Sequence, residues 1–424
     1  MQTLWRTTYH APKTIGRIGH RYASDTHRFA QSDYVLLQPT SQKNETPIFL
    51  GPLTYGSLHN LHKGSISHDS IIGKAVRDVV DSTKPNSKRR TQFRLQEVRL
   101  EDYVLLSRRI VTPIYPHDAN LIVSLFDLHP EPVISDSRDG KPQIEILEAG
   151  TGAGSLTLHL SRAVHAANGP APKLGTDSTE AEREDAVRAW KKSRQAIVHS
   201  IEVSEKHSKH ASMTVRGFRR GQYLGNVDFH VQGVSEWIKQ AMEERSGVPF
   251  LTHAFLDLPG VEHNVAATAS ALKTNGMLIM FCPSITQINQ CALGVRKNKV
   301  PLHLDRVIEL GVNGGTGGRL WDIRLVKPRA SRQNSASMSE RVADGTKEQA
   351  QADVEACVDI LPDDGNRETQ VEPAAAPPSP SPDDDWQMVC RPKVGDRITG
   401  GGFLAVFRKK SQDDTQDSLE AELS

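Results

Sequence analysis

The sequence predicts an α/β fold with a mainly parallel sheet, preceded by a small β domain. Two observations support this fold class. From residue 143 onward, short apolar runs that suit strands alternate with helical apolar spacing, which indicates parallel strands joined by crossover helices. Before that point, strand-like runs follow one another, with Gly, Ser and Pro between them. A chain of 424 residues has room for one large domain or two modest ones.

The small β domain is expected at residues 34–110. Its predicted strands cover 33–39, 47–53 and 92–100. Residues 118–129 then show the apolar spacing of a helix. The second domain is therefore expected at 111–330, completed by 392–410 from beyond a long insertion.

Alternating strands and helices are expected throughout the second domain. The predicted strands cover 143–148, 196–203, 226–231, 253–258 and 276–282, and the predicted helices cover 156–167, 206–219, 235–245, 261–273 and 285–297. Residues 168–192 contain Gly, Pro and acids and interrupt the pattern as an insertion. Two further runs, 319–326 and 402–407, are predicted to pair as an antiparallel hairpin whose loop is very long.

The charge of the chain is unevenly distributed. Its 52 Lys and Arg nearly balance its 51 Asp and Glu, for a net charge of +1. Residues 331–390 hold 13 acids and 4 bases without periodicity, so we expect a disordered acidic insertion over 331–391. The acidic tail at 411–424 has 5 acids and no base. Apart from these segments and the basic N-terminus, an excess of 11 positive charges remains, which favours a polyanionic partner.

The N-terminus has the composition of a targeting segment. Its first 30 residues hold 5 bases and 1 acid, with Ser, Thr and scattered apolar residues. This pattern resembles a mitochondrial presequence, so we expect residues 1–33 to direct the chain to mitochondria. The alternative is a disordered basic arm on a nuclear or cytoplasmic protein. The sequence has no run of about 18 apolar residues and no cysteine spacing typical of metal ligands, so we expect neither a membrane span nor a metal.

A glycine-rich turn lies between the first predicted strand and the first predicted helix of the α/β pattern. Residues 148–155 read EAGTGAGS, and glycines at such a turn let backbone N–H groups approach a ligand closely. The spacing differs from the dinucleotide pattern G-x-G-x-x-G and lacks the Lys of a phosphate-binding P-loop. The pattern E-x-G-x-G-x-G is typical of class I methyltransferases that use S-adenosylmethionine (SAM), in which the turn faces the methionine part.

Two acidic residues end other strands of the same predicted sheet. Glu202 ends the second strand, where an acid can accept hydrogen bonds from both ribose hydroxyls of a nucleoside. Asp257 ends the fourth strand, in the sequence FLDLPG. Ligands of open α/β sheets lie beyond the carboxyl ends of the strands, so both acids are expected to share a crevice with Gly152. The alternative for each is a structural role, as a solvated strand end or a helix cap.

Several motifs together resemble the catalytic subunit of the tRNA (adenine-N1)-methyltransferases, which modify the T-loop adenine. The segment HKGSISHDSIIG at 62–73 resembles part of the family's N-terminal β domain, and 100–122 resembles its domain junction. The segments LEAGTGAGS, FLDLP, CPSITQINQ, LWDIRL and GFLAVFRK follow in the family's order. The resemblance covers about 34–330 and 392–410 and implies the Rossmann-like sheet of class I SAM methyltransferases, with SAM as cofactor and tRNA as substrate.

The resemblance also implies a set of site residues. The residues expected to contact SAM are Ile114, Glu148, Gly150, Gly152, Ala153, Gly154, Ser155, Glu202, His207 and Asp257. The residues expected to contact the substrate are Pro283, Thr286, Gln287 and Arg319. His207 stands where the family often has Arg, and Gly233 where an Asp commonly faces the adenine of SAM. The hydrogen bond to that adenine is therefore expected from Gln232, the backbone or water, or is absent.

The implied reaction is direct in-line methyl transfer to N1 of an adenine extruded from the tRNA. Asp257 is expected to be catalytic, accepting a hydrogen bond from the exocyclic amine and stabilising the positive charge that develops on the base. Candidate phosphate contacts are Lys63, Arg108, Arg109, Arg319 and Arg324. The resemblance further implies a homotetramer, or a heterotetramer with a noncatalytic paralogous subunit.

Two other functions remain open at this point. One is a noncatalytic RNA-binding subunit of the same fold, which would be expected to lose the glycine turn or the strand-end acids. Gly233 is the single feature in favour of this alternative. The other is a methyltransferase acting on a protein or a small molecule, against which the N-terminal domain and the positive charge both argue.

Overall fold

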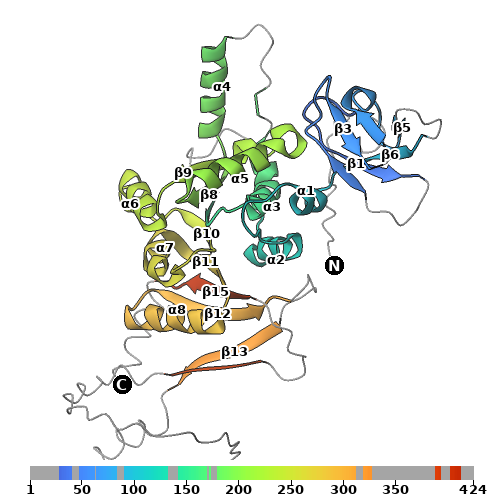
Figure 1. Ribbon diagram of the computed structural model, residues 1–424. Helices are drawn as coiled ribbons and strands as arrows, with labels where there is room; N and C mark the ends of the chain where they lie inside the picture. The colour runs from blue at the N-terminus through green and yellow to red at the C-terminus, as the bar shows by residue number, and fades with distance from the viewer. Residues whose placement is uncertain are drawn as a thin grey trace, which may run out of the picture.

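The computed structural model describes residues 28–40, 47–62, 64–83, 90–131, 142–169, 171–172, 179–311, 319–326, 387–392 and 402–411. Within 319–326 it describes the backbone and not the side chains. Figure 1 shows a large sheet flanked by helices and a separate small β domain that contains the first strands of the chain.

Among the described residues, the large sheet has nine strands, and the central ones are parallel. In spatial order they are β14 (Gln387–Pro392), β13 (Arg319–Val326), β12 (Leu302–Glu309), β15 (Phe403–Lys409), β11 (Leu272–Cys282), β10 (Leu251–Leu256), β7 (Ile144–Ala149), β8 (Ala196–Glu202) and β9 (Val227–Val231). Strands β7 to β11 are parallel, and β15 lies antiparallel between β11 and β12. The predicted α/β fold with a mainly parallel sheet is therefore confirmed.

The chain has eight helices in its described part, of which α1 and α2 precede the first parallel strand and the others follow it. They are α1 (Leu100–Leu106), α2 (Pro116–Phe126), α3 (Ser155–Val164), α4 (Glu180–Lys192), α5 (Glu205–Gly217), α6 (Val234–Glu244), α7 (Val265–Ala271) and α8 (Ile285–Lys297). Short 3₁₀ turns are η1 (His68–Ser70), η2 (His165–Ala167), η3 (Phe218–Gly221), η4 (Leu224–Asn226) and η5 (Val261–Asn264). Helix α4 lies inside the predicted insertion at 168–192 and projects away from the sheet (Figure 1). It begins at a capping box in which Thr179 and Glu182 each bind the other's backbone N–H.

The predicted pairing of 319–326 with 402–407 is wrong. Strand β12, which the apolar pattern did not reveal, lies between β13 and β15 and pairs with both. Because β15 is apolar and buried from Phe403 to Phe407, it is better accommodated inside the sheet than in an exposed hairpin. The partner that β13 does find in a hairpin is β14, which falls at the end of the insertion expected to be disordered.

Several sequence-based expectations concern residues outside the described ranges. These are the arm up to residue 27, Lys63, the acidic insertion apart from 387–392, and the tail from 412. The targeting role of the arm and the disorder of the acidic segments stay predictions. In the part of the chain that the structure describes, no helix is both long and apolar enough to cross a membrane.

Helices cover both faces of the central strands of the large sheet. Ile144 and Ile146 of β7 pack in a core with residues of α1, α2, α3 and α5. Leu147 and Ala149 of the same strand pack in a second core with residues of α6, α7 and α8. Side chains alternate between the faces of a strand, so a strand covered on both sides is apolar at nearly every position.

The small domain has its own sheet and core. Its antiparallel sheet has the order β2 (Ile48–Leu50), β1 (Val35–Pro39), β6 (Gln92–Glu97) and β5 (Val79–Asp81), beside a ribbon of β3 (Leu58–Leu61) and β4 (Gly64–Ser67). Helix α1 contacts both domains. Its Leu100 and Tyr103 pack in a core shared with the main domain, and the Tyr103 ring lies 5.1 Å from that of Tyr34 and 6.1 Å from that of Phe49.

The HKGSISHD motif has a structural task in the small domain. The Nδ1 atom of His68 accepts a hydrogen bond of 3.0 Å from the backbone N–H of Thr54. The carboxylate of Asp69 accepts one of 3.1 Å from the N–H of Gly56. Both side chains therefore hold the loop that precedes β3.

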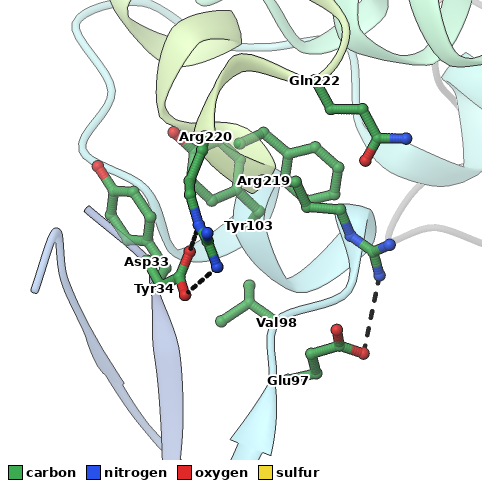
Figure 2. A pocket seen from close by; sticks show the side chains of 9 residues that line it. Asp33, Tyr34, Glu97, Val98, Tyr103, Arg219, Arg220 and Gln222 are labelled. Atoms are coloured by element: carbon green, nitrogen blue, oxygen red, sulfur yellow. Dashed lines mark hydrogen bonds and ion pairs between the residues drawn. The ribbon is translucent and has the colours of Figure 1, made fainter. Parts of the chain in front are cut away.

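The two domains meet at a small polar pocket beside η3 (Figure 2). The Nε and Nη2 atoms of Arg220 donate hydrogen bonds of 2.5 and 2.9 Å to the two oxygens of Asp33, whose side chain is only 7% exposed. The neighbouring Arg219 lies 3.8 Å from Glu97, and both of these side chains are more exposed. The bidentate geometry and the burial of Asp33 make Arg220 the stronger link between the domains.

We expect Arg220→Ala to lower the free energy of unfolding by about 1–3 kcal/mol, because it leaves the buried Asp33 carboxylate without its ionic partner. Arg219→Ala is the matched control, since both arginines have positive φ angles, of 45° and 56°, and meet the same backbone requirement. Its exposed ion pair is worth about 0–1 kcal/mol. Urea unfolding measures both variants, and equal losses would contradict the difference assigned to the two pairs.

Candidate cofactor-binding and active site

A cavity of about 820 Å³ lies beyond the carboxyl ends of β7, β8, β9 and β10. Open α/β sheets bind ligands at this edge, and the volume suits a small molecule. The residues predicted to contact SAM that line it are Ile114, Glu148, Gly150, Gly152, Ala153, Ser155, Glu202, His207 and Asp257. The structure therefore brings the predicted cofactor residues together, with Gly154 outside the wall.

Gly150 allows the ends of β7 and β10 to close on each other. Its φ angle is +86°, and a Cβ atom at this position would overlap the carbonyl oxygen of Asp257. Directly beside it, the N–H of Asp257 donates a 2.9 Å hydrogen bond to the carbonyl of Ala149. The position of Asp257 in the cavity therefore depends on the absence of a side chain at residue 150.

Gly154 serves helix packing instead of lining the cavity. It has a φ angle of +78° at the start of α3, and a Cβ atom there would lie 3.1 Å from the Cα of Ala211 in α5. Thr151 fixes the other side of the turn, because its hydroxyl lies 2.7 Å from the Ser200 hydroxyl on β8. The turn is thus held against both its neighbouring helix and its neighbouring strand.

Glu202 is held in a fixed orientation at the end of β8. One carboxylate oxygen accepts a 3.3 Å hydrogen bond from the N–H of Gly152, and the other accepts a 3.0 Å bond from the N–H of Ser204. The Nδ1 atom of His207 in α5 lies 3.9 Å from the same carboxylate. Each carboxylate oxygen has a further lone pair, so Glu202 can also accept from the hydroxyl groups of a ribose.

Asp257 directly follows β10 and lines the cavity. Burial raises the pKa of its carboxyl to about 6. Among the described residues, its carboxylate has no hydrogen-bond or ion-pair partner. At neutral pH this side chain is therefore ionised and available to accept a hydrogen bond from a ligand.

Glu148 lies deeper, at the base of the turn. Its side chain is buried and accepts a 2.7 Å hydrogen bond from the hydroxyl of Thr157 in α3. Burial raises the pKa of this carboxyl to about 8, in spite of that hydrogen bond. Glu148 is therefore mostly protonated at neutral pH, in contrast to Asp257.

One segment of the cavity wall contains three residues that the sequence did not predict, next to the predicted Ile114. Val111, Thr112 and Pro113, between α1 and α2, also line the cavity. The hydroxyl of Ser155 donates a hydrogen bond to the carbonyl of Ile114 and so ties this segment to the start of α3. Nothing in the local sequence pattern of 111–113 indicates that contact, because it depends on the packing of α1.

The end of β9 supplies the far side of the cavity. Gln232 and Gly233 line it, and so does Glu236 in the first turn of α6. His263 and Asn264 of η5 line it as well. Sequence reasoning missed Glu236, although an acid three residues after a helix N-cap is a recognisable signal.

Three of the predicted substrate residues, Pro283, Thr286 and Gln287, lie outside the cavity wall. Pro283 is exposed, while Thr286 and Gln287 form the start of α8. Ser284 accepts from the N–H of Thr286 at 3.1 Å, and Gln287 accepts from the N–H of Ser284 at 3.3 Å. The present contacts of Thr286 and Gln287 are thus those of a helix cap, and their role toward a substrate stays a prediction. The side chains of Arg319 and Arg324 are outside the described part of the chain.

The residues of this cavity fit SAM. Gly150 and Gly152 have no side chains, so a ligand can approach the backbone of the turn closely. The carboxylate of Glu202, held by the N–H of Gly152, is at the strand end where an acid binds ribose hydroxyls. Within the described residues, no group of three His, Cys, Asp or Glu side chains is arranged to hold a metal ion. The parallel sheet with an inserted antiparallel β15, the turn after β7 and the acid after β8 are together typical of class I SAM-dependent methyltransferases.

Comparisons with known proteins show similarity to one kind of methyltransferase, which acts on tRNA. The chain is 28% identical over 272 residues to the tRNA (adenine(58)-N(1))-methyltransferase TrmI from each of two strains of Thermus thermophilus, covering 64% of this chain and 81% of each relative. No family model matches the chain. Similar solved structures include a SAM-dependent O-methyltransferase from Thermotoga maritima, with 15% identity, coverage of 91% and 95% and a TM-score of 0.49. Another is the tRNA (m1A58) methyltransferase TrmI from Aquifex aeolicus, with 17% identity, coverage of 91% and 100% and a TM-score of 0.44.

Proposed function

We propose that this protein transfers the methyl group of SAM to N1 of the T-loop adenine of tRNA, the base at position 58 named in its Thermus relatives. The observation that carries the chemistry is the meeting of the glycine turn, Glu202 and Asp257 in one cavity. The similarity to the two tRNA methyltransferases supports the choice of substrate.

The chain contributes positioning and charge stabilisation to this reaction. When bound, SAM supplies a methyl group that is already activated on a sulfonium centre. Adenine N1 has a free lone pair and carries no proton, so no general base is required. The ionised carboxylate of Asp257 accepts a hydrogen bond from the exocyclic amine of the adenine and stabilises the positive charge that forms on the ring.

The substrate reaches this cavity as an extruded base, since a T-loop adenine inside folded tRNA is otherwise covered. Arg108 and Arg109 are exposed and lie three and two residues before the wall segment 111–114. Their position suits phosphate contacts that hold the tRNA while the base enters. The excess positive charge of the chain outside its acidic segments supports the same kind of partner.

The resemblance of the sequence to tRNA (adenine-N1)-methyltransferases also supports a proposal about the assembly. We propose a tetramer, formed by four copies of this chain or by this chain with a noncatalytic paralogous subunit. Light scattering on the purified chain, combined with an activity measurement, distinguishes the two. An active homotetramer supports self-assembly, whereas a monomer or dimer that becomes active only with a second subunit supports the mixed assembly.

The proposed function is tested by incubating the purified chain with labelled SAM and an unmodified tRNA transcript. We expect one labelled methyl group per tRNA, located at N1 of the T-loop adenine by nuclease digestion and mass spectrometry. A transcript with guanosine in place of that adenine is the matched control and should remain unlabelled. Methylation of the control, of another base or of the protein itself would contradict the proposed substrate. Absence of transfer, with or without a paralogous subunit, would contradict the activity.

A further inference from the structure

A carboxylate occupies the space that a side chain at residue 233 would fill. A Cβ atom built on Gly233 would overlap the Oε2 atom of Glu236, and the Cδ of Glu236 would lie 2.9 Å from it. Gly233 is the N-cap of α6, and Glu236 is three residues later, in the first turn. The side chain of Glu236 therefore folds back over the glycine.

The carboxylate of Glu236 is free to bind a ligand. Among the described residues it has no hydrogen-bond or ion-pair partner, and the residue is exposed to solvent. It also lines the cavity that holds the glycine turn and Glu202. The helix beneath it is firmly packed, because Trp237 and Ile238 are buried in the core.

The arrangement of the strand ends indicates what lies next to this carboxylate. The turn after β7 and Glu202 after β8 take the first two places along the sheet edge, and β9 comes next. Because the end of β9 lines the same cavity directly beyond Glu202, a nucleoside whose ribose is bound by Glu202 can place its base there. An adenine presents an exocyclic amino group that donates hydrogen bonds, whereas a carboxylate only accepts them.

We propose that Glu236 recognises the 6-amino group of the cofactor's adenine and thereby replaces the acid that is absent at Gly233. This inference rests on the proposed function only in taking SAM as the cofactor. It assigns recognition of the cofactor's adenine to Glu236 of α6, three positions after Gly233, where the family commonly has an aspartate.

The first test measures binding in the absence of turnover. Isothermal titration calorimetry compares S-adenosylhomocysteine with S-inosylhomocysteine, in which the 6-amino donor is replaced by an oxygen acceptor. We expect the intact chain to bind the adenosyl ligand roughly tenfold or more tightly than the inosyl ligand, and Glu236→Ala to remove this preference. Glu243→Ala, an exposed acid of the same helix that lines a different groove, should leave the preference unchanged.

The second test restores an acid at the glycine. Gly233 has φ and ψ angles of −70° and 151°, which any residue can adopt, so Gly233→Asp is free of backbone strain. In the otherwise unchanged chain, the new side chain competes with Glu236 for the same space and weakens binding. In the double variant Gly233→Asp with Glu236→Ala, we expect most of the preference for the adenosyl ligand to return. The effects of the two substitutions on the affinity for this ligand should therefore be strongly non-additive.

Two results would overturn the proposal. One is a Glu236→Ala variant that keeps the full preference for the adenosyl ligand. The other is an equal loss of affinity for both ligands, with no recovery from the added aspartate, which indicates a general change of the cavity. Neither test uses tRNA, so a failure to methylate tRNA and a failure of this inference are separate results.

Discussion

Replacing Asp257 by Ala or Asn should lower kcat for tRNA methylation by about 10²–10³-fold, since removing one group that stabilises developing charge typically has this effect. The half-buried carboxylate has no partner among the described residues, so little else in the fold depends on it. We therefore expect an unchanged far-ultraviolet circular dichroism spectrum and a similar melting temperature for both variants.

The same residue predicts a pH dependence. The pKa of Asp257 is raised to about 6 by burial, so the carboxyl becomes protonated as the pH falls through this value and ceases to act as a charged acceptor. The plot of kcat/KM against pH should therefore fall below about pH 6 in the intact enzyme, and this acid limb should be absent in Asp257→Asn.

A matched control for these measurements is Asp127→Asn. Asp127 is an exposed residue at the end of α2 with a φ angle of 51°, a conformation that Asn tolerates. Its activity and pH profile should match those of the intact chain. A nearly normal turnover of Asp257→Ala would remove Asp257 from the mechanism.

Replacing Gly150 by Ala should abolish detectable binding of S-adenosylhomocysteine and also destabilise the fold. The new methyl group would overlap the carbonyl oxygen of Asp257, and the φ angle of +86° is unfavourable for any L-residue with a side chain. Strain and overpacking of this kind each cost about 1–3 kcal/mol, so we expect a loss of about 2–5 kcal/mol in the free energy of unfolding. Calorimetry and urea unfolding measure the two effects.

Gly169→Ala separates backbone strain from steric overlap. Gly169 also has a positive φ angle, of +65°, but a Cβ atom there would meet no atom within 4 Å. This variant should lose only about 1–2 kcal/mol from the left-handed conformation and keep its affinity for the ligand. If Gly150→Ala binds as well as Gly169→Ala, the close approach of β7 and β10 does not control the cavity.

The main features of the cavity were predictable from local sequence. The turn at 148–155 and the acids Glu202 and Asp257 each follow an apolar strand, and parallel strands end at the same edge of their sheet. The sheet itself was predictable for a similar reason, because five strands alternate with helices along the chain. Such signals are local, and they suffice wherever the topology is regular.

The irregular part of the sheet was not predictable in this way. Strand β12 has an interrupted apolar pattern, and its position between β13 and β15 depends on which faces are already covered by helices.

The ion pair that joins the two domains was not predictable from local sequence either. Asp33 and Arg220 are 187 positions apart, and no local pattern marks either side chain.

The alternation of five strands with helices, the glycine turn and the strand-end acids were thus settled by periodicity and residue type, since these depend on neighbours in the chain. The tertiary structure decided which acid stands beside Gly233, how β15 is enclosed and where the two domains are joined. These features depend on side chains that come into contact only after the backbone has folded. The carboxylate of Glu236, for example, occupies a space that is open only because residue 233 is a glycine.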